Sequence, residues 1–274
     1  MIPAAFDYVR ADSAEAAIAA VAEHGDDAKL LAGGMSLIPL MKLRLATPSV
    51  LVDLGRLRDL SYIRDNGDEL AIGSLTRHRD LETSDLLAKE CGVLRAVAAQ
   101  VGDNQVRHRG TLGGTVAHGD PASDLPAALL ALDATFVVQG QSGTREVAAR
   151  DFFQGFLETA LAADELLTEI RVRKAGPAGF DFQKFNRRAQ DWAIVGAVAA
   201  RVNGSMRVAL VNMGSTPLRA TAVEEALASG ASTADAAQRA ADGTEPNADL
   251  NASVEYRQHL ARVLVRRALE AAGG

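Results

Sequence analysis

The sequence predicts an α+β fold, and three observations carry that prediction. Helix and strand patterns alternate over the first part of the chain, and signals for β-hairpins replace them from about residue 61. A linker containing Gly and Pro, residues 174–179, then precedes three strand patterns followed by three helical ones. The 274 residues, 48% of them hydrophobic, are enough for two or three units that share their cores.

The first elements predict a small, mainly parallel sheet preceded by a helix. Ser13 is followed by apolar residues at helical spacing as far as His24-Gly25, which indicates a capped helix closed by a glycine. Between two apolar strands lies Gly33-Gly34-Met35-Ser36, a glycine-rich loop whose backbone amides can hold a phosphate. The strands are expected at residues 29–32 and 50–54, and a helix or turn at residues 37–42.

The middle of the chain is predicted to contain antiparallel hairpins and helices. Asp65-Asn66-Gly67-Asp68 separates two strand patterns and is a strong signal for a hairpin turn. Two helices are expected next, at residues 75–87 and 89–101. A second hairpin is expected from strands at residues 135–139 and 144–147, and one further strand at residues 165–172.

A second glycine-rich segment, Arg109 to Pro126, lies between these helices and the second hairpin. Its Gly113-Gly114 pair is flanked by two threonines, an arrangement that lets a loop bring bare backbone amides close to a charged ligand. Either Asp120 or Asp124 could cap the helix that follows, which reads as buried over residues 127–134. A tight turn and a capped helix explain this segment equally well by itself. Two such loops together favour a phosphate-bearing nucleotide.

The part after the linker predicts an antiparallel sheet and helices. Asn203-Gly204-Ser205 is the expected hairpin turn between its last two strands. The three strands are expected at residues 180–187, 193–202 and 206–213, and the three helices at residues 222–228, 233–241 and 254–272.

The composition argues against several classes of function. A formal net charge of −6 without any basic run argues against nucleic acid and against an anionic membrane surface. The single cysteine, Cys91, rules out an iron–sulfur cluster or a thiolate zinc site built from this chain alone, and no histidine spacing predicts a metal. The longest apolar run, residues 193–200, is too short to span a bilayer, and the N-terminus is unlike a signal peptide. A cytoplasmic protein is therefore expected.

Several common enzyme motifs are missing. No Gly-x-Gly-x-x-Gly sequence opens a helix, there is no Walker-type loop, and Ser36 does not lie in a Gly-x-Ser-x-Gly turn. A Rossmann dinucleotide site, an NTPase and a serine hydrolase are thus poorly supported. No side chain is predicted to be catalytic. Among the histidines, His118 in the second glycine-rich segment is the one candidate for ligand contact.

Both glycine-rich segments resemble the flavin motifs of a known family. Residues 32–44 are similar to the first flavin motif of the FAD-binding medium subunit of molybdenum hydroxylases. Residues 109–114, with Asp120-Pro121 and Asp124-Leu125-Pro126, are similar to its second motif. A third patch is also similar, and the resemblance covers essentially the whole chain in order. That patch comprises residues 165–170, 184–188 and 191–195.

The resemblance implies the fold in more detail. It implies a two-lobed FAD-binding domain of the vanillyl-alcohol-oxidase/molybdenum-hydroxylase type, followed by a C-terminal α+β domain with an antiparallel sheet and helices. The FAD-binding domain is expected to span residues 1–176, with lobes of about 1–57 and 58–176, and the C-terminal domain residues 177–274. FAD is expected between the two lobes.

The same resemblance implies which residues contact FAD. Residues 30–37 match the stretch that wraps the pyrophosphate, Asp124 matches an acid that holds polar groups of the nucleotide, and Asp191 and Trp192 match positions near the isoalloxazine ring. Two positions depart from the family pattern: Met35 stands where a polar residue is common, and Thr115 where Asn or Asp is common. The implied FAD-binding residues are Leu30, Leu31, Ala32, Gly33, Gly34, Met35, Ser36, Leu37, Val101, Gly102, Thr111, Gly113, Gly114, Thr115, Asp124, Leu167, Lys184, Asp191 and Trp192.

The function implied is electron transfer within a larger oxidoreductase. In this family a large molybdenum subunit, which holds the molybdenum cofactor, oxidises the substrate. A small iron–sulfur subunit with [2Fe–2S] clusters passes single electrons to FAD, and FAD passes pairs to an external acceptor. The resemblance implies that this chain assembles with both subunits, as a dimer of heterotrimers.

Two other functions remain open at the level of sequence. A flavin-dependent UDP-sugar enolpyruvate reductase also uses a Gly-Gly-x-Ser loop, but it needs an NADPH-dependent site with a serine or cysteine proton donor late in the chain. The pattern from Asp120 to Pro126 speaks against it. The other alternative is a scaffold subunit that has lost its flavin.

Overall fold

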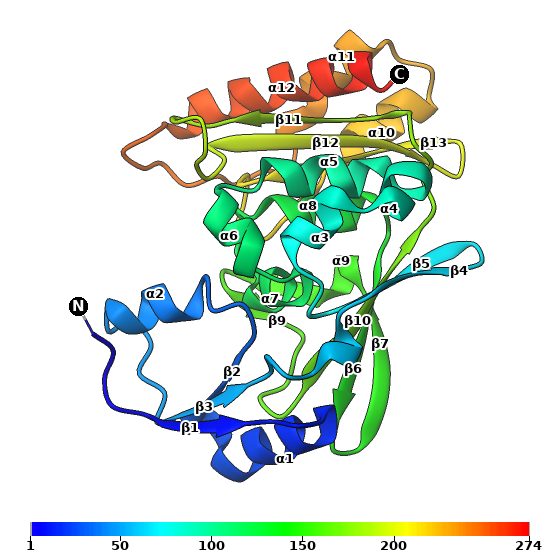
Figure 1. Ribbon diagram of the computed structural model, residues 1–274. Helices are drawn as coiled ribbons and strands as arrows, with labels where there is room; N and C mark the ends of the chain where they lie inside the picture. Colours follow the sequence, from blue (N-terminus) through cyan, green and yellow to red (C-terminus); the bar gives the residue numbers. More distant parts are fainter. Residues whose placement is uncertain (1, 274) are drawn as a thin grey trace.

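The computed structural model describes residues 2–273 (Figure 1). Its N-terminal part is a three-stranded sheet of order β1-β3-β2 in which both strand pairs are parallel. Helix α1 (Ala14–His24) covers this sheet, and the Ser13 hydroxyl accepts a hydrogen bond from the Ala16 amide, as predicted for a capped helix. The strands are β1 (Asp7–Arg10), β2 (Ala28–Leu31) and β3 (Val50–Asp53), and the short helix α2 (Leu37–Lys42) follows β2. Strand β1 was not predicted, because its residues lack an apolar run.

A five-stranded sheet of order β4-β5-β10-β6-β7, antiparallel throughout, forms the middle of the molecule. Both predicted hairpins are present in it. The strands are β4 (Ile63–Asn66), β5 (Glu69–Gly73), β6 (Thr135–Gly140), β7 (Gly143–Ala148) and β10 (Leu166–Arg173). A small two-stranded sheet lies beside them, formed by β8 (Phe153–Gly155) and β9 (Glu158–Thr159).

The helices of this middle part are shorter and more numerous than predicted. Two helices were expected at residues 75–87 and 89–101, and the structure has three helices there. Ser84 and Cys91 have non-helical backbone conformations and separate one helix from the next. Ser84 also caps the next helix, since its hydroxyl accepts a hydrogen bond from the Leu87 amide. These three helices are α3 (His78–Thr83), α4 (Asp85–Glu90) and α5 (Gly92–Gln100). A further helix that was not predicted, α6 (Asn104–Arg109), follows them.

The second glycine-rich segment is the start of a helix, so its prediction as a loop was wrong. Thr111 is the N-cap of α7 (Leu112–His118), and Gly113 and Gly114 lie in the first turn. The threonine cap outweighs the low helix propensity of the two glycines. The next helix, α8 (Asp124–Ala131), has Ser123 as its N-cap, so neither aspartate proposed for that position occupies it. A single-turn helix, α9 (Ala149–Phe152), completes this part.

The C-terminal part is an antiparallel sheet with helices on its outer face (Figure 1). The three predicted strands and three predicted helices are present, and a short fourth strand that was not predicted completes the sheet. Asn203 and Gly204 both have positive φ at the predicted hairpin turn. The strands are β11 (Phe180–Phe185), β12 (Val195–Val202), β13 (Ser205–Val211) and β14 (Leu218–Arg219). The helices are α10 (Thr221–Ala228), α11 (Thr233–Gln238) and α12 (Val254–Ala271), and three short 3-10 helices lie elsewhere at Gly25–Asp27, Arg58–Leu60 and Arg239–Ala241.

Strand β12 is buried on both faces, which explains its nearly uninterrupted apolar sequence. Val198 and Ala200 belong to one core together with residues of α5 and α8, whereas Ala197 and Ala199 belong to a second core together with α12. The first core therefore crosses the linker at residues 174–179. The C-terminal sheet is fixed against the middle part by a shared hydrophobic core, not only by the linker.

Candidate functional site

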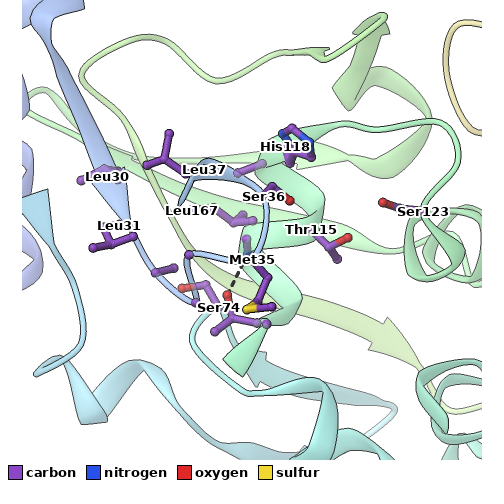
Figure 2. Close-up of a pocket in the computed structure, with 18 of the residues that line it drawn as sticks. Leu30, Leu31, Met35, Ser36, Leu37, Ser74, Thr115, His118, Ser123 and Leu167 are labelled. Carbon is purple, nitrogen blue, oxygen red and sulfur yellow. Dashed lines mark hydrogen bonds between the residues drawn. The ribbon is translucent and has the colours of Figure 1, made fainter. Parts of the chain in front are cut away.

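A cleft of about 760 Å³ lies between the N-terminal sheet, helix α7 and the connection from β11 to β12. All the residues that the sequence implied for FAD binding line this one cleft, although they come from segments far apart in the chain. Its volume lies within the ordinary range for small-molecule and cofactor sites. Figure 2 shows side chains of the first loop, including Met35 and Ser36, and Thr115 and His118 of α7 around the same space.

The first glycine-rich loop supplies backbone donors. Gly34 has a φ of 75°, which turns the chain between the end of β2 and the start of α2. No acceptor is found within residues 2–273 for the backbone amides from Gly33 to Ser36. Successive unpaired amides in such a turn form a concave site for an anion.

Gly33 has a different role, because it lies where the two glycine-rich segments meet. A Cβ atom at this position would overlap the carbonyl oxygen of Arg109 and lie 2.9 Å from the Cα atom of Gly110. The residue must therefore be glycine for the backbones to approach so closely. The sequence predicted two separate phosphate loops, and the structure joins them through this contact.

The amides of the second segment are already used within the protein. The Gly113 amide donates to the Ser74 carbonyl at 2.8 Å, and the Gly114 amide donates to the Thr111 hydroxyl at 3.1 Å. The expectation of bare amides at these two glycines was therefore wrong. The groups of this segment that can contact a ligand are therefore side chains: the hydroxyls of Thr111 and Thr115 and the ring of His118.

A buried ion pair forms part of the cleft wall. Lys184 Nζ lies 2.7 Å from Asp124 Oδ2 and donates to the Gln100 carbonyl at 3.1 Å, and both charged side chains are almost completely buried. Burial raises the pKa of Asp124 to about 6, while the Lys184 ammonium opposes the shift. The other carboxylate oxygen, Oδ1, has no partner in the described part of the chain.

Two further buried polar atoms line the cleft, and sequence reasoning missed both. Ser74 Oγ and His78 Nδ1 have no hydrogen-bond partner among residues 2–273. Because His78 Nε2 lies 3.1 Å from the carbonyl oxygen of Thr111, this nitrogen carries the proton and Nδ1 is an acceptor. Burial lowers the pKa of His78 to about 4, so the ring is neutral at pH 7. Ser74 and His78 become part of the cleft because residues 74–78 pack against α7. No sequence pattern indicates this packing.

The connection from β11 to β12, residues 186–194, contributes Asp191 and Trp192. The ion pair of Asp191 with Arg188, 2.9 Å long, lowers the pKa of the Asp191 carboxyl. Gly102 lies directly under this connection, since a Cβ atom there would be 3.0 Å from the Asp191 amide nitrogen. The Trp192 side chain remains largely exposed beside the cleft.

These features suit a dinucleotide with a pyrophosphate. The first loop offers unpaired amides to an anion, and Asp124, Ser74 and His78 offer unpartnered polar atoms to hydroxyl or amide groups. Leucine and valine side chains supply the apolar walls. Across residues 2–273, no group of side chains is arranged to hold a metal ion.

Comparison with known proteins identifies the chain. A family model described as the FAD binding domain in molybdopterin dehydrogenase matches residues 4–174, and one described as the CO dehydrogenase flavoprotein C-terminal domain matches residues 180–272. The chain belongs to the FAD-binding medium chains of the molybdenum hydroxylases. It is therefore an oxidoreductase subunit, and the resemblance found in its two glycine-rich segments is confirmed.

Individual relatives match this medium chain over nearly its whole length. The carbon monoxide dehydrogenase medium chain of Hydrogenophaga pseudoflava is 41% identical over 99% of this chain and 98% of its own. The 6-hydroxypseudooxynicotine dehydrogenase complex subunit alpha of Paenarthrobacter nicotinovorans is 38% identical, with coverages of 98% and 95%.

Solved structures agree with this assignment. A carbon monoxide dehydrogenase structure from Hydrogenophaga pseudoflava superimposes with a TM-score of 0.96 at 40% identity, covering 100% of this chain and 99% of the matched one. Quinoline 2-oxidoreductase from Pseudomonas putida 86 gives a TM-score of 0.93 at 32% identity, with coverages of 100% and 99%. The α+β fold implied by the resemblance is thereby confirmed.

Proposed function

We propose that this medium chain holds FAD in the cleft and serves as an electron-transfer subunit between an iron–sulfur subunit and an external acceptor. The observation that supports this most directly is that one cleft is lined both by the amides from Gly33 to Ser36 and by buried polar side-chain atoms, all of which lack partners among residues 2–273. Bound FAD supplies the exchange between one-electron and two-electron transfer. The chain supplies binding, orientation and electrostatics.

The roles proposed for individual residues follow from their chemistry. The amides of the first loop and the Thr111 hydroxyl bind the pyrophosphate, since backbone N–H groups bind anions without adding side-chain bulk. Asp124 Oδ1 accepts a hydrogen bond from a hydroxyl or amide of the nucleotide. Lys184 holds the Asp124 carboxylate in place through their buried ion pair, and Trp192 would lie beside the flavin ring.

We also propose that the FAD-binding part spans residues 1–176, with lobes of about 1–57 and 58–176, and that residues 177–274 close the cleft. The linker composition supports this division, and Lys184, Asp191 and Trp192 line the cleft from the C-terminal side. The core shared across the linker means that the two parts fold together.

The partners proposed are a small iron–sulfur subunit with [2Fe–2S] clusters and a large molybdenum subunit, assembled as a dimer of heterotrimers in the cytoplasm. The relatives support this, because one is a subunit of a dehydrogenase complex and a similar solved structure is that of a Cu,Mo-CO dehydrogenase. The single cysteine of this chain is buried and cannot ligate a cluster. Along residues 2–273, no helix combines the length and apolarity needed to cross a bilayer.

The proposed division of labour predicts that the FAD-loaded chain alone does not react with hydroxylase substrates. Candidate heterocyclic and aldehyde substrates and carbon monoxide should leave its visible flavin absorbance unchanged without oxygen. Adding the subunits that copurify with the chain should allow one of these substrates to bleach the flavin. Bleaching by a substrate in the absence of any other subunit would show that this chain has its own substrate chemistry and would overturn the proposal.

Asp124→Ala is expected to weaken FAD binding without abolishing it. One hydrogen bond to a ligand contributes about 0.5–3 kcal/mol, so the dissociation constant should rise by about twofold to 150-fold. The measurement is flavin content after gel filtration at decreasing FAD concentrations. Asp68→Ala, at an exposed hairpin turn, is the control and should retain flavin as the unmodified protein does. Equal retention by the Asp124 variant would remove this residue from the proposed site.

A further inference from the structure

The connection that carries Trp192 is held at its C-terminal end by residues outside the cleft. The Ile194 amide donates to the Phe185 carbonyl at 2.8 Å and closes the base of the connection. Asn212 Nδ2 then donates to the carbonyl oxygens of Ala193, at 2.8 Å, and of Ile194, at 3.4 Å. The two carbonyls directly after Trp192 are therefore fixed by one side chain.

Asn212 also holds a second segment that leads to the cleft. Its backbone amide donates to the Pro121 carbonyl at 2.8 Å, and Pro121 lies three residues before Asp124. Asn212 has a φ of 62°, a left-handed conformation that asparagine tolerates better than most residues. This conformation follows directly after β13 and lets the backbone and the side chain of one residue bind two different segments.

Arg257 strengthens the same point of attachment from helix α12. One end of its guanidinium donates to the Ile194 carbonyl, and the other lies 2.7 Å from Asp249 Oδ2. The side chain is only 3% exposed. A buried guanidinium needs both partners to offset its lost hydration, so its position is tightly determined.

We propose that Asn212 is a positioning residue that fixes Trp192 and the segment before Asp124 on the two sides of the cleft, with Arg257 holding the same carbonyl from behind. The importance for flavin rests on the proposed function, but the effect on Trp192 does not. The middle of the connection is held more weakly, because Arg187, Arg188 and Gln190 are exposed. Loss of the attachment should therefore free Trp192 without unfolding the sheet.

The decisive variant is Asn212→Gly. Glycine accepts a positive φ and keeps the backbone amide that bonds to Pro121, so the substitution removes only the side-chain bonds to residues 193 and 194. Asn203→Gly is the matched control, because Asn203 also has a positive φ, of 50°, but lies at the exposed turn between β12 and β13. Thermal unfolding of both variants shows whether each is folded.

The readout on the FAD-free chain is the fluorescence of Trp192, which is the only tryptophan in the sequence. Acrylamide should quench Trp192 faster in Asn212→Gly than in the unmodified chain or in Asn203→Gly. Asn212→Asp should increase quenching further, because its carboxylate would face the two carbonyl oxygens that the amide now binds. Arg257→Lys should have a smaller effect in the same direction, since a lysine cannot bond both Ile194 and Asp249 in this geometry.

The second readout is FAD affinity, measured on the chain together with the subunits that copurify with it. Asn212→Gly should raise the dissociation constant by about threefold to tenfold, because bound FAD must then order the loosened connection. Asn203→Gly should leave it unchanged.

The outcomes separate this inference from the proposed function. Identical Trp192 quenching in Asn212→Gly and the unmodified chain would overturn the positioning role, whatever happens to FAD. If quenching rises in the variant but the unmodified assembly takes up no FAD, the positioning of Trp192 stands and the proposed function fails. If quenching rises and FAD affinity falls as expected, both are supported.

Discussion

Replacing Gly33 with valine is expected to abolish FAD retention and to lower the affinity at least about 100-fold. A Cβ atom at this position would overlap the backbone of Arg109 and crowd Gly110, and backbone cannot move aside as a flexible side chain can. The first loop must therefore shift away from the second segment. Its unpaired amides then move away from the pyrophosphate, and the loss of two charge-assisted hydrogen bonds is enough for an effect of this size.

The sensitivity of Gly33 arises from its contact with another segment and not from its own backbone conformation. Among the glycines of the first loop, Gly34 is the one with positive φ, whereas Gly33 is constrained by contact with another segment. Gly114 is less constrained, since a Cβ there would meet only the Thr111 hydroxyl within 3 Å. Gly114→Ala should consequently lose less affinity than Gly33→Ala.

The measurement for Gly33→Val is flavin content after gel filtration, with circular dichroism to show that the chain is folded. Gly67→Asn is the control, because Gly67 has a φ of 77° in an exposed turn with no neighbouring atoms and asparagine tolerates this geometry. A folded Gly33→Val protein that keeps its full flavin content would show that the contact between the two segments is not required for binding.

Lys184→Met is expected to have the largest effect on stability, lowering the free energy of unfolding by about 3–5 kcal/mol near pH 8. Methionine replaces the volume of the lysine stem but leaves the buried Asp124 carboxylate without its cation. An uncompensated charge in this position is costly, because Asp124 Oδ1 already lacks a partner within the described residues.

The loss should be smaller near pH 5, and the sign follows from the pKa of Asp124. Burial raises this pKa to about 6 in the folded protein, above the value of about 3.9 in an unfolded chain. The folded state therefore binds more protons between these values, and the stability contributed by Asp124 falls as the pH rises through this window. Removing the Lys184 ammonium raises the folded pKa further, which extends the window upward and increases the loss at high pH.

Urea unfolding near pH 5 and near pH 8 measures this difference. The double variant Asp124→Asn/Lys184→Met serves as the control, because it removes both charges and should recover most of the lost stability at the higher pH. An equal loss at both pH values, or a double variant as unstable as Lys184→Met, would contradict the assignment of the effect to a stranded carboxylate.

The two parts of the cleft differ in how far the sequence could describe them. The first loop was predicted correctly between a strand and a helix or turn, which is the short helix α2, because Gly33-Gly34 after an apolar run is a local signal. The second segment was predicted as a loop, although Thr111 caps a helix there. A paired glycine favours a loop locally, and only the hydrogen bonds of residues 112 and 113 to Thr76 and Ser74 show how the helix start is fixed.

The resemblance identified some residues of the cleft, and others can be recognised only in the tertiary structure. The implied residues, including Asp124 and Lys184, are brought together in one cleft, and their contacts with FAD remain a prediction. Ser74 and His78 were missed because their significance depends on lacking a partner, which no sequence pattern records. The link from Asn212 to the connection around Trp192 was likewise invisible in the sequence.

The sequence by itself determined the local features of this medium chain: its hairpin turns at Gly67 and Asn203-Gly204, most of its helices and strands, and the motifs that carry its family. These depend on backbone preferences and apolar spacing among neighbouring residues. The tertiary structure decided which glycine amides are free and which are used, why Gly33 must be glycine, and how one core crosses the linker. Such features depend on which distant segments meet, because a hydrogen-bond donor or a missing side chain acquires its role only from the atoms opposite it.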